Sequence, residues 1–183
     1  MAVGTALCRV TGLGIDPFNA LCIGVANLLH KSSAFTTFVF QIIIFIVVTL
    51  RNRKLVGVGT IIPIVEFGYL LEKISLCFQQ IAKISWQLKI IIFLIGLIVT
   101  ALGMAIYMTC DLGMVPYDAI SFLISNKRPF AARVINDALV AVIAYLIGGP
   151  ISIGTILFAF ATGPLISWFR EKFVERAILE FIK

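Results

Sequence analysis

The chain has 183 residues, of which 61% are hydrophobic and only 13% charged, whereas ordinary soluble domains are about 45–50% apolar and 25% charged. This composition excludes a soluble globular protein. Lys and Arg outnumber Asp and Glu by 15 to 9, which gives a net charge of +6. We attribute this excess to basic residues at span ends and their contact with membrane lipid, not to nucleic acid. Residues 90–110 and 138–169 contain no charged side chain, and runs of this length predict transmembrane helices.

The first half of the chain predicts four helices. The second of them begins at Pro17 after a Gly-x-x-Pro break, and its 14 residues are too few for a comfortable span. The first is also short, because the matching helix of the second half starts about a dozen residues earlier. We therefore expect a truncated first span, with Met1 internal to the natural protein. The predicted helices cover residues 1–12, 17–30, 35–50 and 56–76.

The second half predicts the same order of elements. A long span is followed by a Gly-x-x-Pro break, a short helix that begins at Pro116, a second span, a glycine turn and a third span. At roughly 20 residues per span, the chain holds about six transmembrane helices in one membrane domain, residues 1–183. The predicted helices cover residues 88–110, 116–126, 132–148 and 151–169.

An internal repeat relates the two halves. Residues 13–20 (LGIDPFNA) recur as residues 112–119 (LGMVPYDA) at an offset of 99. Two later glycine motifs recur at an offset of 95, so the halves differ by four residues. We interpret the pattern as a duplication, with repeat one in residues 1–78 and repeat two in residues 88–173. The later motifs are residues 58–61 with 153–156 and 67–70 with 162–165.

The distribution of charge bears on topology. If the short Pro-led helices are interfacial or re-entrant, each repeat has three crossings, and the odd number inverts one repeat relative to the other. Residues 51–54, residues 127–128 with Arg133, and the segment from Arg170 then lie on one side, which the positive-inside rule makes cytoplasmic. If the short helices cross the bilayer, the repeats are parallel and the densest basic clusters lie on opposite sides. Charge favours the inverted arrangement, with the C-terminus in the cytoplasm.

No pattern in the sequence is typical of an enzyme. The chain has one histidine, His30, and no HExxH, GxSxG or phosphate-loop motif. Its four cysteines lack the paired spacing of metal sites and are expected to be small apolar fillers. We therefore expect no catalytic residue, metal site or cofactor.

Polar side chains within spans are costly and therefore candidates for ligand binding. Glu66 lies near the middle of its span between Pro63 and Gly68, which can free backbone carbonyls for a ligand. It could bind a cationic solute or a proton, and the alternative is a protonated Glu bonded to a neighbouring helix. Asn136 matches Gln41 in the repeat, which places an amide at the same depth in both halves, for a shared cavity or for bonds between helices.

Three further polar positions, Asp118, Asn19 and Asp137, have both a structural and a functional interpretation. Asp118 and its counterpart Asn19 each follow a proline by two residues, so they either cap a helix or help to present its free N–H groups to a polar ligand. Asp137 follows Arg133 by four residues, a spacing typical of an ion pair at the membrane interface. Asp16 is predicted to be another interface residue. The candidate substrate-binding residues are Glu66, Gln41, Asn136, Asp137, Asn19 and Asp118.

The repeated Leu-Gly-x-x-Pro-aromatic-Asp/Asn-Ala motif, the glycine turn and the closing Gly-Pro-Leu-Ile of residues 163–166 resemble the YczE-like group of small bacterial integral membrane proteins, related in appearance to the YitT and YyaS groups. The resemblance covers essentially the whole chain. It implies a protein of the bacterial cytoplasmic membrane, and it supplies neither a substrate nor a catalytic residue.

These observations predict a multi-pass permease or solute-binding membrane component, with a polar pocket between the two repeats. The competing hypothesis is a non-transporting scaffold or regulatory accessory protein, in which the same glycines serve helix packing. The partners expected are membrane lipid and an unknown small solute. A homodimer and an energising partner subunit both stay open, because the chain has no nucleotide-binding motif of its own.

Overall fold

The computed structural model describes residues 1–110, 112–125 and 129–174. All regular secondary structure within these ranges is helical, which confirms the all-α prediction. Three segments of the described chain are long and apolar enough to cross a membrane, and α1 and α2 are shorter apolar helices. The expectation of about six spans therefore stays a prediction. The three long segments are Ser33–Arg51, Trp86–Thr109 and Ile153–Lys172.

Prolines set the helix boundaries of the first half. Helix α2 begins at Pro17, a position where the missing proline N–H would have no partner within the helix. Helix α4 passes into a π-helical turn at Pro63–Phe67 and continues as α5, since Pro63 cannot donate to the regular helical ladder. The helices are α1 (Ala2–Thr11), α2 (Pro17–Leu29), α3 (Ser33–Arg51), α4 (Val58–Ile62) and α5 (Gly68–Cys77).

The second half has a similar order of helices, and its first helix, α6, is longer than α1. Helix α7 begins at Pro116, as predicted, and α9 contains Pro164 in its interior. Short 3₁₀ turns at Arg53–Leu55 and Gln79–Lys83 lie in the connections of the first half, and a π-helical turn at Arg170–Val174 follows α9. The helices are α6 (Trp86–Thr109), α7 (Pro116–Ile124), α8 (Pro129–Leu146) and α9 (Ile153–Phe169).

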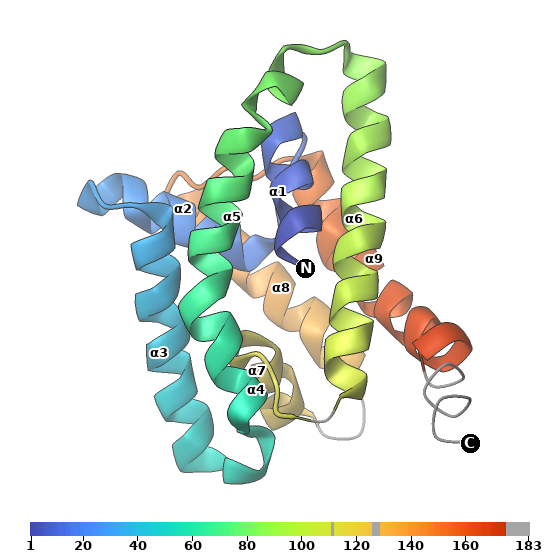
Figure 1. Ribbon diagram of the computed structural model, residues 1–183. Helices are drawn as coiled ribbons and strands as arrows, with labels where there is room; N and C mark the ends of the chain where they lie inside the picture. The colour runs from blue at the N-terminus through green and yellow to red at the C-terminus, as the bar shows by residue number, and fades with distance from the viewer. Residues whose placement is uncertain (111, 126–128, 175–183) are drawn as a thin grey trace.

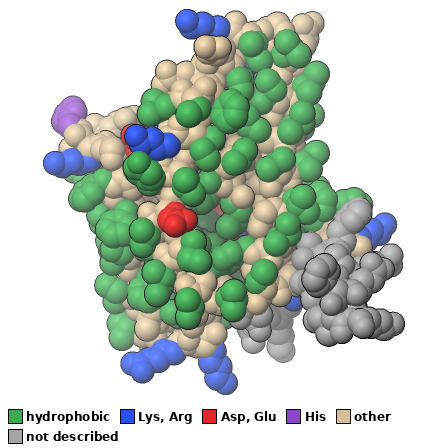
Figure 2. All heavy atoms as spheres, viewed as in Figure 1, with side chains coloured by type: hydrophobic (Ala, Val, Ile, Leu, Met, Phe, Trp, Pro, Cys, Tyr) green, Lys and Arg blue, Asp and Glu red, His purple; other side chains and the backbone are tan. Residues whose placement is uncertain are grey.

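The helices form a bundle in which consecutive long elements alternate in direction (Figure 1). In that view α1 and α5 run upward, whereas α3 and α6 run downward. Helix α1 packs against α5 and α6, α9 packs against α6 and α8, and the short helices α2 and α7 each pack against both α3 and α8. The visible surface is largely hydrophobic, with basic side chains near its ends (Figure 2). The predicted basic pair at 127–128 lies outside the described residues.

Helices α1 and α6 cross through small residues. A methyl group added at Gly4 would collide with the backbone of Gly96 and the side chain of Thr100. The Thr100 and Thr5 hydroxyls lie 3.5 Å apart at the same crossing. Glycine at such positions lets helix backbones approach closely.

Each Gly-x-x-Pro break is hydrogen-bonded by a Gly-Thr helix start from the other half. Gly154 N–H donates to the carbonyl of Leu13 over 3.1 Å, and Gly59 N–H donates to the carbonyl of Leu112 over 2.9 Å. The Thr155 hydroxyl accepts a further bond from Ile15 N–H. The Gly-Thr motifs thus satisfy backbone groups where the chain is not helical. These hydrogen bonds hold the starts of α2 and α7 inside the bundle.

Candidate binding pocket

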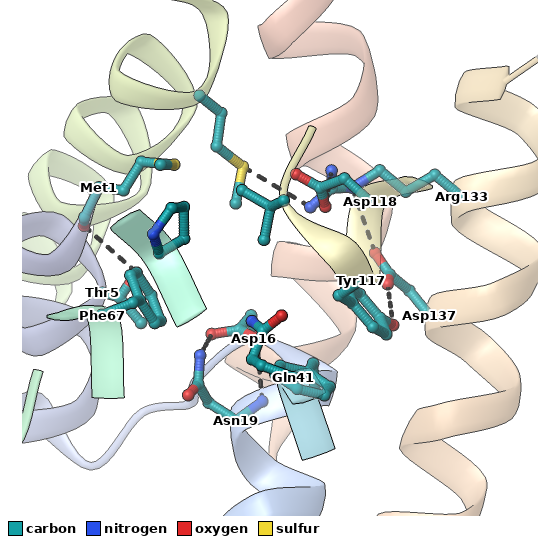
Figure 3. A pocket seen from close by; sticks show the side chains of 14 residues that line it. Met1, Thr5, Asp16, Asn19, Gln41, Phe67, Tyr117, Asp118, Arg133 and Asp137 are labelled. Carbon is teal, nitrogen blue, oxygen red and sulfur yellow. Dashed lines mark hydrogen bonds and ion pairs between the residues drawn. The ribbon is translucent and has the colours of Figure 1, made fainter. Parts of the chain in front are cut away.

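A small cavity lies where the two breaks lead into α2 and α7 (Figure 3). It offers about 40 Å³ to the centres of water molecules, room for about three of them at roughly 10–15 Å³ each. Its wall combines residues from both halves of the chain. The lining residues are Met1, Thr5, Asp16, Phe18, Asn19, Gln41, Pro63, Phe67, Met104, Val115, Tyr117, Asp118, Arg133 and Asp137.

The second half contributes a closed network of charges. Arg133 of α8 is only 5% exposed, and its Nη1 lies 2.7 Å from Oδ1 of Asp118 on α7. Its Nε lies 3.7 Å from Oδ2 of Asp137, one helical turn further along α8. The hydroxyl of Tyr117 donates to Oδ1 of Asp137 over 2.6 Å. Each carboxylate on this side therefore has a positive charge nearby, which offsets part of the cost of its burial.

The first half contributes acceptors without a cation. Asp16 caps the N-terminus of α2 by accepting from Asn19, over 3.0 Å to the backbone N–H and 2.6 Å to the side-chain Nδ2. Gln41 of α3 is 2% exposed, and its Oε1 has no hydrogen-bond partner among the described residues. Figure 3 shows Asp16, Asn19 and Gln41 on one side of the pocket and the Arg133 network on the other.

Two aromatic rings connect these sides. Phe18 of α2 and Tyr117 of α7 stack with ring centroids 4.6 Å apart. Both rings line the cavity, and both belong to a small buried cluster with Cys22. The stack therefore packs the starts of the two short helices against each other.

Four of the six predicted site residues line this cavity: Gln41, Asn19, Asp118 and Asp137. Asn136 is buried next to Asp137 but does not line the cavity, and its Nδ2 has no partner in the described part of the chain. The repeat was informative here, because it singled out matching polar positions in both halves.

The structure places Glu66 outside this pocket. This side chain is exposed and is absent from the pocket wall. Residues 62, 65, 66 and 69 share the outer face of the helix, since positions three and four apart lie together, and Ile62, Val65 and Tyr69 are also exposed. Pro63 and Ile64 take the buried face instead.

The predicted ion pair of Arg133 and Asp137 is present, and both residues are buried. Asp16 lines the pocket, and its depth in the membrane stays a prediction. Arg133 also has a shorter contact to Asp118, which spacing along one helix could not reveal. The sequence analysis did not include Tyr117 among the site residues. Tyr117 matches Phe18 in the repeated motif and differs from it by a hydroxyl group, which was the available signal.

The described residues contain no group of three or more His, Cys, Asp or Glu side chains that could hold a metal ion. The chemistry of the pocket is therefore that of hydrogen bonds and monovalent charge. It presents carboxylate, amide and phenol groups together with one guanidinium.

Apolar helices around a buried polar cluster define a helical membrane protein. The chain belongs to a family of unknown function, DUF6198, whose match covers residues 1–171. No solved structure matches it significantly.

Three curated relatives are similar to this chain, and each is named as an uncharacterized protein. An uncharacterized protein of Haemophilus influenzae is 27% identical over 92% of this chain and 78% of its own length. The uncharacterized protein YyaS of Bacillus subtilis is 29% identical over 98% of this chain and 90% of its own. The uncharacterized membrane protein YczE of the same species is 24% identical over 84% and 72%. The resemblance to the YczE-like group is thus confirmed.

Proposed function

We propose that the protein is a small-solute permease, or the solute-binding membrane component of one, whose pocket lies between two inverted repeats. The observation that carries the proposal is the buried polar cavity, because polar groups inside a membrane protein are costly and are commonly retained for a ligand or ion pathway. Glycine- and proline-interrupted segments at matching positions are a sequence pointer to such a site.

Matching contacts support the repeat. The packing of α1 on α5 corresponds to that of α6 on α9, and α2 on α8 corresponds to α3 on α7. The hydrogen bond from Gly154 to Leu13 has its counterpart in the bond from Gly59 to Leu112. Such exchanged contacts are expected of two halves related by a two-fold axis.

The directions of the helices support inversion. Helix α1 runs upward in Figure 1 and its counterpart α6 runs downward. Arg51 ends α3 and Arg170 follows α9, and both helices point toward the lower end of the bundle in Figure 1. By the positive-inside rule that end faces the cytoplasm of a bacterial plasma membrane, which puts the C-terminus on the cytoplasmic side.

A scaffold or regulatory accessory protein is the second candidate. Two features favour it: the cavity is small, and the network around Arg133 pairs its charges internally. In this version the buried ion pairs fix helix register rather than bind a solute. A homodimer or an energising subunit is compatible with either function, because exposed apolar residues such as Leu50 and Leu146 can contact lipid or another chain.

Ligand-dependent thermal stability distinguishes the two candidates. The full chain, purified in detergent, is screened with amines, amino acids and vitamins. A compound that binds the folded state raises the unfolding temperature. We expect that rise to be lost in Asp137→Asn and kept in Glu66→Gln, the matched control outside the pocket. No rise with any compound would favour the scaffold, and an intact rise in Asp137→Asn would exclude this pocket as the solute site.

A further inference from the structure

We infer that the pocket holds a small monovalent cation, an alkali-metal ion or ammonium, between the carboxylate of Asp16 and the amide oxygen of Gln41. This inference rests on the proposed function, since it assigns an ion to the same pocket.

The first step is the unused acceptor on Gln41. Gln41 lines the cavity and is 2% exposed, and no donor among the described residues reaches its Oε1. Buried polar atoms are nearly always paired with protein or ordered water. A buried acceptor without a donor, on a residue of the cavity wall, therefore calls for a ligand that brings a positive charge or an N–H group.

The second step is the carboxylate of Asp16. Both bonds it accepts come from the neutral residue Asn19, and a carboxylate has about four lone-pair sites, so acceptor capacity remains. Within the described chain no Lys, Arg or His lies at ion-pair distance from it, whereas Arg133 pairs with Asp118 and Asp137. Asp16 is thus the carboxylate of the pocket that lacks a close cation.

The third step is the total charge of the wall. Among the side chains of the wall, Asp16, Asp118 and Asp137 face a single guanidinium, so these four side chains are net negative when all are ionised. In a low-dielectric interior such an imbalance is strongly unfavourable. A bound cation corrects it without breaking any bond already made.

The fourth step is size and valence. The 40 Å³ available is far below the roughly 300–1,000 Å³ of pockets for organic ligands, so an organic solute enters only if the helices move apart, whereas a small ion with one or two waters fits directly. A divalent ion such as Ca²⁺ takes about six to eight oxygen ligands, and the described residues form no such carboxylate group. Two side-chain oxygens supplemented by water suit a monovalent ion.

The test is the dependence of thermal unfolding on the cation. The full chain in detergent is heated in sodium, potassium, ammonium or choline chloride at equal ionic strength and pH, where choline is too large for the cavity. We expect one or more of the small cations to raise the unfolding temperature by roughly 3–6 °C over choline once its concentration is tenfold above the dissociation constant. The sodium, potassium and ammonium series distinguish a metal ion from ammonium.

Two pocket variants and one control locate the effect. Asp16→Asn removes the charge but keeps an equally good helix cap, and Gln41→Leu removes the amide oxygen at similar volume. We expect both to lose the cation-dependent shift and Glu66→Gln to keep it. If Gln41→Leu folds poorly, the Asp16→Asn result decides alone.

Three results would overturn the inference: equal unfolding temperatures of the wild type in all four salts, an unchanged shift in Asp16→Asn, or a dependence on pH alone, which would indicate a proton site. The solute screen is scored separately. A solute shift without a cation shift rejects the ion site and keeps the permease. A cation shift without a solute shift keeps the ion site and rejects the permease.

Discussion

The two sides of the pocket occupy matching places in the chain but are stabilised by different chemistry. On the α7–α8 side, Arg133, Asp118, Asp137 and Tyr117 form a network in which every charge has a partner. On the α2–α3 side, Asp16 relies on neutral donors and Gln41 keeps an unpaired oxygen. The α7–α8 side thus pairs its charged side chains with one another, whereas the α2–α3 side leaves acceptors without a charged partner.

The largest effect is expected from removing the Arg133 charge from the network on the α7–α8 side. Arg133→Met leaves Asp118 and Asp137 buried without their cation, which should destabilise the fold by about 3–5 kcal/mol. Thermal unfolding in detergent measures the loss, with Glu66→Gln as the control. Adding Asp118→Asn to Arg133→Met should recover part of it. A midpoint within about 2 °C of wild type for Arg133→Met would contradict the network.

The next largest effect on stability is expected at the two glycines, Gly154 and Gly59, whose N–H groups donate to the Gly-x-x-Pro breaks. Gly154→Ala forces a methyl group into the carbonyl of Leu13, while Gly59→Ala meets the carbonyl of Leu112 at 2.9 Å. We expect each to cost about 1–3 kcal/mol, as overpacking does, with Gly154→Ala the worse of the two. Unfolding temperatures of the two variants measured in parallel give the order. The reverse order would contradict the closer approach at Leu13.

A smaller effect is expected from the hydroxyl of Tyr117. Tyr117→Phe keeps the stack on Phe18 but removes the donor to Asp137, and hydrogen bonds to charged groups contribute about 1.5–3 kcal/mol. We expect the low end of that range, because Arg133 remains close to Asp137. Phe18→Leu provides the converse change, since it removes the ring and spares the bond. Wild-type stability in Tyr117→Phe would show that the bond contributes nothing.

The smallest effect on stability is expected from a substitution on the α2–α3 side of the pocket. In choline chloride, Asp16→Asn should cost less than about 0.5 kcal/mol, because Asn and Asp cap helices equally well and the change removes a buried negative charge that has no close cation. Unfolding temperature again measures the change. A loss comparable with that of Arg133→Met would show that Asp16 has a structural charge partner, and the contrast between the two sides would no longer hold.

The sequence predicted the segments that surround the pocket better than it predicted which side chains enter it. The starts of α2 and α7 at Pro17 and Pro116 follow from proline chemistry, which acts locally. The matching amide at Gln41 followed from the repeat. Both signals are independent of how the helices pack.

The gaps in the prediction share one physical cause. In a soluble helix the apolar stripe marks the buried face, but a membrane helix is apolar all round, so hydropathy does not tell the core from the lipid. Glu66 was placed by its depth in the span, and the face it occupies is the outer one. The short contact of Arg133 to Asp118 joins α8 to α7, and no spacing within either helix could have indicated it.

The Phe18–Tyr117 stack has a consequence for how the pocket could open. One ring comes from each half, and both lie on the cavity wall, so the halves cannot rock apart at this depth without sliding one ring off the other. Tyr117 also carries the bond to Asp137. The same motion would remove the hydroxyl donor from the buried carboxylate of Asp137, so a separation of α2 from α7 would also change the electrostatics of the pocket.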